Sequence, residues 1–238
     1  MKRLIAVALL SATLATAAAP LVEPHHRLEM ADNAARARVA LTLDACGGAF
    51  DADLIALLVA HRVPATIFAT RKWILRNPAG VAALLEHPDL FDVEDHGSAH
   101  VPATLSPGRR VYGMAGAGTV AQLRSEVSLG AEAITQATGR APRYYRGATA
   151  MYDTESLKTI QDMGYQIAGF SVNADAGATL SQAGVVARLR SVQAGDIVIA
   201  HMNKPASHTA RAFAVALPEL LARGLVFVKL AQGRLKPL

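Results

Sequence analysis

The 238-residue sequence has little that would crosslink it or anchor it in a membrane. Its only cysteine, Cys46, excludes an internal disulfide, so the fold must depend on a hydrophobic core. The longest apolar stretch runs from Leu4 to Ala19 and is shorter than the roughly 20 residues that a spanning helix needs. The Met-Lys-Arg start and the alanines before Pro20 predict a signal peptide over residues 1–19, with an uncleaved anchor as the alternative. We therefore expect export, periplasmic or secreted, without stable membrane insertion.

The sequence also lacks a marked excess of either charge. Lys and Arg number 24 and Asp and Glu 19, and the loss of Lys2 and Arg3 with the signal peptide leaves 22 against 19, a net charge of +3. The basic residues are scattered, with no aromatic-interleaved run of the kind that follows phosphates, so nucleic acid is not an expected partner. One tryptophan and 5% aromatics provide few flat surfaces for a long sugar groove, which favours a short substrate.

Short apolar runs alternate with longer segments of helical period, the pattern of repeated β-α units around parallel strands. After an N-terminal tail over 20–37, one domain is expected over 38–238, because α/β barrels commonly reach this size undivided. The expected strands are 38–44, 65–70, 90–94, 143–146, 166–172, 196–201 and 225–230. The expected helices are 51–61, 73–86, 119–138, 154–163, 179–191 and 206–223. Seven strands nearly close a barrel, so the sequence predicts an α/β fold of the parallel (β/α)7-8 barrel type.

Polar residues follow five of the expected strands. They are Asp44, the Asp95-His96 pair, Arg146, Asp175 and His201, in chain order. In a parallel barrel the carboxyl ends of the strands share one face, so these side chains meet at one rim. Strand ends are often polar in any case, and chance accounts for one or two such residues. Five together predict a functional site.

Two histidines, His96 and His100, are four residues apart, a spacing that places both imidazoles on the same face of a helical turn. Neutral imidazoles so placed can bind one transition metal. A pair at this spacing is often only a surface or capping feature, and its position at the predicted rim is what favours a site. His25 and His26, near the predicted cleavage site, are assigned to a flexible tail.

Five segments in order resemble the motifs of the polysaccharide deacetylases of the NodB-like group, from about Val39 to Leu230. They are Leu-Thr-Leu-Asp-Ala-Cys-Gly-Gly over 41–48, His-Gly-Ser-Ala-His over 96–100, Ala-Thr-Gly-Arg-Ala-Pro-Arg-Tyr-Tyr-Arg over 137–146, Ser-Val-Asn-Ala-Asp over 171–175 and Gly-Asp-Ile-Val-Ile-Ala-His over 195–201. The resemblance implies a distorted β/α barrel and a divalent metal, often zinc. It also implies hydrolysis of an N-acetyl amide on a cell-wall or exported glycan.

The first motif departs from the family at a metal ligand. Its second aspartate, normally a ligand beside the two histidines, is Ala45 here. Asp44 is assigned to the metal together with the histidine pair, while Asp95 and Cys46 remain open as sources of the missing ligand, because zinc accepts oxygen and sulfur as well as nitrogen. The third motif continues as Gly-Ala-Thr over 147–149 and the fourth lacks its tryptophan, so the resemblance does not determine the sugar.

We also expect a division of catalytic roles among these residues, in which the role of Arg146 is the one that the resemblance implies. Asp44 would accept a proton from the attacking water, and Arg146 would hold Asp44 in place and ionised. His201 would protonate the departing nitrogen with Asp175 behind it, although an ordinary turn residue is the alternative for Asp175. The expected function is metal-assisted hydrolysis of an N-acetylated glycan. The alternatives are the same mechanism on a small amide or imide, and a non-catalytic glycan-binding relic, which Ala45 favours.

Overall fold

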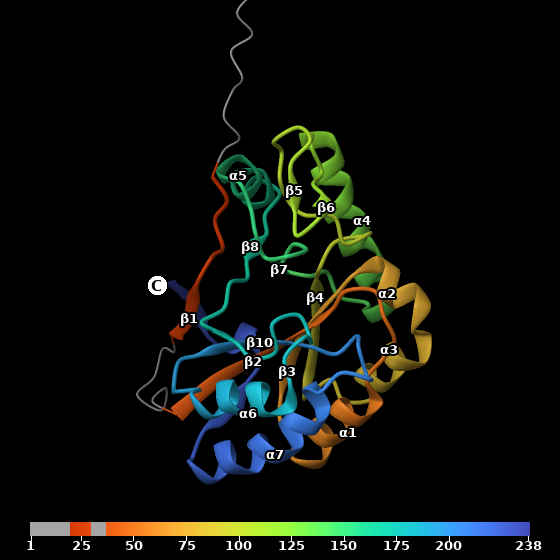
Figure 1. Ribbon diagram of the computed structural model, residues 1–238. Helices are drawn as coiled ribbons and strands as arrows, with labels where there is room; N and C mark the ends of the chain where they lie inside the picture. The colour runs from red at the N-terminus through yellow and green to blue at the C-terminus, as the bar shows by residue number, and fades with distance from the viewer. Residues whose placement is uncertain (1–19, 30–36) are drawn as a thin grey trace, which may run out of the picture.

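The computed structural model describes residues 20–29 and 37–238 (Figure 1), so the predicted signal peptide lies outside the described residues. The strands are β1 (His26–Glu29), β2 (Arg38–Ala45), β3 (Ala65–Ala69), β4 (Phe91–Asp95), β5 (Arg110–Val111), β6 (Met114–Ala115), β7 (Tyr144–Tyr145), β8 (Gln166–Ile167), β9 (Val172–Asn173), β10 (Ile197–His201), β11 (Val226–Val228) and β12 (Arg234–Pro237). The helices are α1 (Ala52–Ala60), α2 (Arg71–Arg76), α3 (Pro78–Leu85), α4 (Val120–Thr138), α5 (Thr154–Asp162), α6 (Gln182–Arg190), α7 (Thr209–Ala222) and the short 3₁₀ helix η2 (Leu230–Gln232). Within these ranges, no helix has both the length and the apolar composition that crossing a membrane requires.

One curled sheet of eight strands forms the centre of the molecule. Its order is β8-β7-β4-β3-β2-β10-β9, with β11 paired to the start of β2, and all of these pairings are parallel. The two end strands, β8 and β9, are consecutive in the chain, and only residues 168–171 separate them. The steps from the last residue of β8 to the first of β9 span at most about 18 Å, so the sheet must curl until its two ends approach each other. This arrangement confirms the predicted α/β fold, a distorted parallel barrel.

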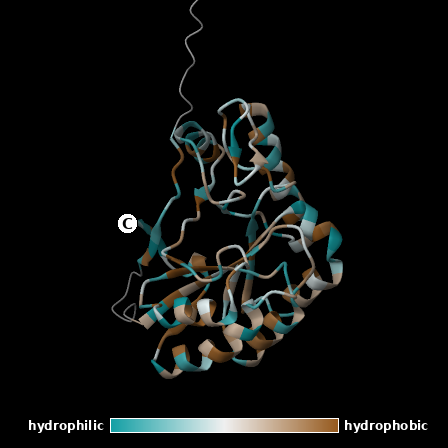
Figure 2. Ribbon diagram, in the orientation of Figure 1, coloured by the Kyte–Doolittle hydropathy of each residue, from teal (hydrophilic) through white to brown (hydrophobic). Residues whose placement is uncertain are grey.

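Strand β2 is buried on both faces, as is usual for a parallel strand covered by helices. Leu41 and Leu43 belong to the large apolar cluster beneath the helices, whereas Ala40 belongs to the inner cluster together with Phe68. Because side chains alternate along a strand, Asp44 lies on the same inner side as Ala40. Figure 2 shows the apolar residues along the strands and on the sides of α1, α6 and α7 that face them.

The predicted elements recur with shifts of a few residues at their ends, and two of them are divided. The expected helix 73–86 is two helices, α2 and α3, because Pro78 lacks an N–H and disfavours a helical conformation at Asn77. The expected strand 166–172 is interrupted between β8 and β9, where the chain crosses from one end of the sheet to the other.

The described part of the predicted N-terminal tail packs against the domain. Strand β1 pairs antiparallel with β12, and His25 forms a bridge with Phe170. His26 Nδ1 accepts a hydrogen bond from the backbone N–H of Gly169 at 3.0 Å. The prediction that these two histidines belong to a flexible tail is therefore wrong: they lie in an ordered segment, near the point where the two ends of the sheet approach each other. The segment is ordered because β12 provides a strand partner, which the local sequence does not reveal.

Candidate functional site

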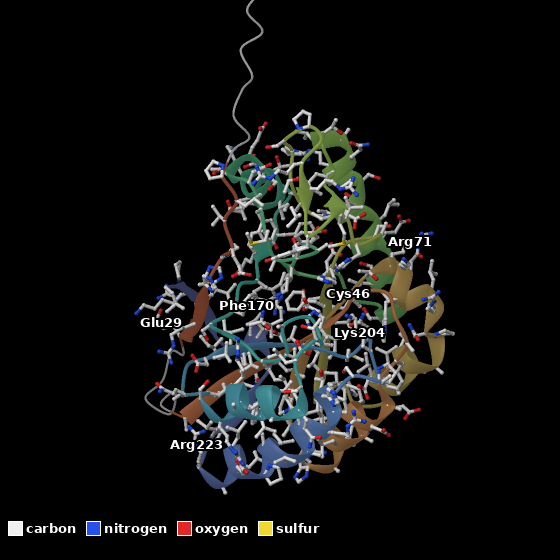
Figure 3. All side chains as sticks on the ribbon, viewed as in Figure 1. Glu29, Cys46, Arg71, Phe170, Lys204 and Arg223 are labelled. Atoms are coloured by element: carbon white, nitrogen blue, oxygen red, sulfur yellow. The ribbon has the colours of Figure 1, made fainter. Side chains whose placement is uncertain are left out.

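A pocket of about 490 Å³ opens at the carboxyl ends of the central strands. Its lining includes five side chains close to the ends of these strands that can bind metals or transfer protons: Asp44, Cys46, His96, His100 and His201. Asp44 and His201 are direct register partners on β2 and β10, which explains how residues distant in sequence meet. Cys46, Phe170 and Lys204, all of which line the pocket, lie near the middle of the molecule in Figure 3. Of the residues that the sequence placed at one rim, Asp44, His96 and His201 line the pocket, whereas Asp95, Arg146 and Asp175 do not.

Arg146 lies fully buried behind the pocket, at the opening between the two ends of the sheet. Its Nε donates to the carbonyl of Ala168 at 3.0 Å and its Nη2 to that of Gly169 at 3.3 Å. Its Nη1 donates to Thr42 Oγ1 and to Asp44 Oδ1, both at 2.9 Å. These acceptors offset the cost of burying a guanidinium, which is prohibitive without partners. Arg146 therefore holds both the crossing segment and Asp44.

Asp44 is buried yet ionised. Burial raises the pKa of its carboxyl group, but the charges of Arg146, His96 and His201 outweigh burial and lower that pKa below its ordinary value. While Oδ1 accepts from Arg146, Oδ2 lies 3.8 Å from His96 Nε2. One oxygen of Asp44 is thus fixed by the guanidinium, and the other is on the side of the histidines.

The two histidines of the second motif do not lie on a helix, contrary to the helical-turn interpretation of their spacing. Residues 96–100 form a loop after β4, in which Gly97 has φ +86° and His100 has φ +67°. The turns of this loop bring the two ring centroids to 5.0 Å. The Nδ1–H of His96 donates to the carbonyl of Arg146 at 2.5 Å, which leaves Nε2 as the ring nitrogen on the side of Cys46 and Asp44.

The carboxylate of Glu126, on α4, holds this loop from behind. Its Oε1 accepts from the backbone N–H groups of Ala99 and Val101, and Oε2 also accepts from Ala99, each at 3.0 Å. These amides flank His100, whose left-handed conformation is unfavourable for a residue other than glycine. Glu126 was absent from the residues chosen by sequence. The one feature of the sequence that could have indicated Glu126 is its position, an acidic residue among the apolar residues on the buried face of an amphipathic helix.

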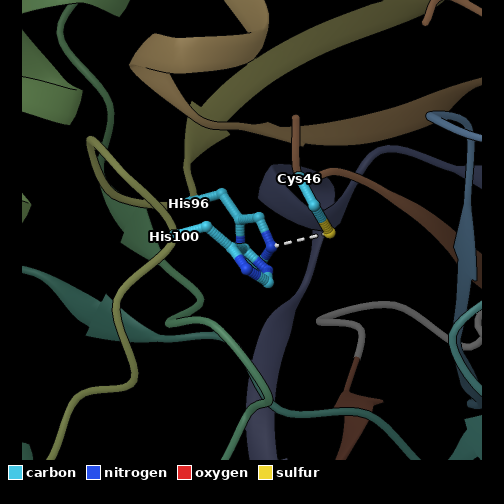
Figure 4. Close-up of side chains that lie close together, drawn as sticks. All are labelled: Cys46, His96 and His100. Carbon is cyan, nitrogen blue, oxygen red and sulfur yellow. Dashed lines mark hydrogen bonds between the residues drawn. The ribbon is translucent and has the colours of Figure 1, made fainter. Parts of the chain in front are cut away.

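Cys46 meets both histidines. Its Sγ and one ring nitrogen from each of His96 and His100 lie within 4.8 Å of one another, and Figure 4 shows the three side chains converging from two loops. The distance from Sγ to His96 Nε2 is 3.4 Å. Burial raises the pKa of the Cys46 thiol, but His96 and then His100 and His201 outweigh it and lower that pKa well below its ordinary value. A thiolate and two imidazoles are donors that suit zinc, so these residues fit a divalent metal.

Asp95, which the sequence left open as a ligand, is not among the residues that line the pocket. Its Oδ1 accepts the backbone N–H of Gly97 at 2.8 Å. Burial, which outweighs that hydrogen bond, raises the pKa of Asp95 well above its ordinary value. Asp95 therefore supports the turn at Gly97 rather than facing the pocket.

His201 and Asp175 form the other polar group of the site. The Nδ1–H of His201 donates to Asp175 Oδ1 at 2.8 Å, while Asp175 Oδ2 accepts from the backbone N–H of His201 at 2.8 Å and from Thr209 Oγ1 at 3.0 Å. Burial lowers the pKa of His201, but the hydrogen bond to Asp175, followed by contributions from Cys46 and Asp44, raises it well above its ordinary value. Asp175 is fully buried and orients His201, which an ordinary turn residue would not do.

Comparison with known proteins extends these observations. The family model described as polysaccharide deacetylase matches residues 31–168. The Bc1960 peptidoglycan N-acetylglucosamine deacetylase superposes with a TM-score of 0.71 at 20% identity, covering 88% of this chain and 91% of that one. An acetyl xylan esterase from Clostridium thermocellum, solved with a cobalt ion, gives 0.66 at 19% identity, covering 82% and 89%. BA3943 from Bacillus anthracis, a family 4 pseudoenzyme, gives 0.64 at 19% identity, covering 85% and 68%. Comparison with curated proteins finds no match.

Proposed function

Since the chain belongs to the polysaccharide deacetylase family, we propose that it is a metal-assisted amide hydrolase that removes acetyl groups from the N-acetylated sugars of a cell-wall or exported glycan. The observation that carries this proposal is the convergence in one pocket of a metal-binding group, an arginine-held carboxylate and a carboxylate-held imidazole. The Bc1960 structure, whose fold this chain shares, is that of a deacetylase of this kind.

His96 and His100 would hold the metal, and we propose zinc, one of the ions that imidazole nitrogens bind well. When bound, the ion would polarise the amide carbonyl and make water more acidic near neutral pH. The hydrogen bond from His96 Nδ1 to the Arg146 carbonyl orients the ring and selects Nε2 for binding.

Asp44 accepts the proton of the attacking water. Arg146 occupies Oδ1 of Asp44, so the proton goes to Oδ2, the oxygen on the side of His96. The guanidinium also keeps Asp44 ionised at neutral pH, as a general base requires. Arg146 thus both positions Asp44 and stabilises its negative charge.

His201 delivers a proton to the departing nitrogen. Asp175 binds Nδ1–H, which leaves Nε2 to carry the transferable proton into the pocket. Because its pKa lies well above the ordinary value, His201 holds that proton at neutral pH. Asp175 stabilises the imidazolium without touching the substrate.

A small amide is the second candidate substrate, and one observation supports it. The sole tryptophan, Trp73, is fully buried in the core, so Tyr112 and Phe170 are the aromatic residues that line the pocket. Tyr112 is 79% exposed. The volume of about 490 Å³ suits one sugar or a compound of similar size.

The test is acetate release by the zinc-loaded full chain from N-acetylglucosamine oligomers and from a panel of small amides. We expect Asp44→Asn and His201→Ala each to reduce turnover at least ~100-fold, the usual contribution of a general base or acid. The control His61→Ala removes an exposed imidazole at the end of α1 and should leave turnover unchanged. Absence of acetate from every substrate would favour the non-catalytic relic, as in the pseudoenzyme BA3943.

Export is a further part of the proposal. The predicted signal peptide over 1–19 supports a periplasmic or secreted enzyme. Sequencing the amino terminus of protein from the exported fraction should find a start near residue 20. An intact Met1 in that fraction would contradict cleavage.

A further inference from the structure

We propose that Cys46 is the third protein ligand of the metal, so that two imidazoles and a thiolate bind the ion where the family pattern has two imidazoles and a carboxylate. This inference rests on the proposed function, because it concerns the same metal. It assigns a ligand type that the family resemblance does not predict.

The end of β2 explains why the ligand moves by one residue. Ala45 is fully buried in the apolar cluster beneath the helices and offers no ligand atom. Asp44 and Cys46, two residues apart on an extended segment, both line the pocket. The position after Ala45 is therefore the first that can bring a replacement donor to the histidines.

The distances fit a zinc-sized ion. Tetrahedral zinc with a Zn–S bond of ~2.3 Å and Zn–N bonds of ~2.0–2.1 Å separates sulfur from nitrogen by about 3.6 Å. The Sγ of Cys46 is 3.4 Å from His96 Nε2, and all three donor atoms of the trio lie within 4.8 Å of one another.

The two aspartates that competed for the role fit it less well than Cys46. Asp44 Oδ1 is bound by Arg146, and the carboxylate does not belong to the group of donors that lie mutually within reach. Asp95 accepts from Gly97 and does not line the pocket. With Cys46 on the metal, Asp44 is left free to act as the base.

A thiolate ligand predicts which ions bind. Sulfur favours zinc and cobalt over the hard ions magnesium and calcium, which take oxygen ligands. Because Cys46 is the only cysteine of the chain, any spectroscopic or chemical signal from a thiol or thiolate reports on this position alone.

The first experiment is cobalt titration of the purified full chain. The wild type should show a thiolate-to-cobalt charge-transfer absorption in the near ultraviolet. Cys46→Asp, which restores an oxygen ligand, should bind cobalt without that absorption, and Cys46→Ser should bind at least tenfold more weakly. Cobalt that binds the wild type without charge transfer, while acetate is still released, overturns the inference and leaves the proposed function standing. A wild type that neither binds metal nor releases acetate overturns both.

The second experiment measures alkylation of Cys46 by iodoacetamide. Zinc should slow the reaction at least tenfold in the wild type and have no effect on its rate in His96→Ala. The matched control is Ser128→Cys in the Cys46→Ser background, an exposed position on α4 where zinc should not change the rate. Equal rates with and without zinc in a wild type shown to bind zinc would contradict the ligand role.

Discussion

The carboxylate of Glu126 provides the sharpest test of how the fold sets the position of His100. Glu126 is 7% exposed, lies on α4 and accepts the backbone N–H groups of Ala99 and Val101. Hydrogen bonds to a charged group contribute ~1.5–3 kcal/mol each and neutral ones ~0.5–1.5 kcal/mol. Glu126→Gln keeps an accepting oxygen but loses the charge. The hydrogen bonds from the two amides should therefore stabilise the loop by about 2 kcal/mol less in total.

The loss should appear in metal binding as well as in folding, because the two amides flank the residue that carries a proposed ligand. At 1.4 kcal/mol per factor of ten, about 2 kcal/mol corresponds to a roughly 30-fold weaker zinc affinity. This lies within the ~10–100-fold range typical of residues that support metal ligands from behind. Glu126→Ala, which leaves two amides unpaired at ~1–3 kcal/mol each, should weaken binding further.

Zinc affinity is measured by competition with a chromophoric chelator, and the unfolding free energy by urea denaturation of the metal-free protein. Glu132→Gln removes the same charge from an exposed position of α4 and should change both quantities little. If Glu126→Gln lowers the unfolding free energy but leaves zinc affinity within twofold of the wild type, the carboxylate supports only packing. That result would refute a role in positioning His100.

Three further predictions test other contacts. Gly130→Ala should destabilise the protein by about 1–3 kcal/mol in urea, as overpacking does, because its Cβ would lie 2.2 Å from Asp95 Oδ1. Gly184→Ala, whose Cβ meets nothing nearer than 3.5 Å, is the control that should not destabilise. Asp175→Asn should lower kcat about 10²-fold or more with little change in KM, since Asp175 holds His201 but does not line the pocket; a change confined to KM would contradict this. Chelation of divalent ions should abolish acetate release, with zinc or cobalt restoring it and magnesium not; activity that survives chelation would refute metal assistance.

Much of the fold follows from local patterns in the sequence. Apolar runs of strand length, separated by segments of helical period, predict parallel β-α units, and the polar residues that end the strands predict the rim at which Asp44 and His201 meet. In a parallel barrel the carboxyl ends of the strands lie on one face, whether or not the sheet closes completely. The strand ends that meet at this rim could therefore be predicted before any contact was known.

Contacts between distant segments were decided by the tertiary structure alone. The spacing of His96 and His100 suggested a helical turn, but a loop held by Glu126 brings the rings together, because hydrogen bonds from α4 stabilise a backbone that local propensity disfavours. Sequence likewise assigned Asp44 to the metal and left Asp95 and Cys46 open as sources of the missing ligand. Their separation into an arginine-bound carboxylate, a turn acceptor and a neighbour of the histidines depends on contacts between distant segments. Direction and reach of a side chain are properties of the packed molecule, whereas the residue types and their order along the strands belong to the sequence.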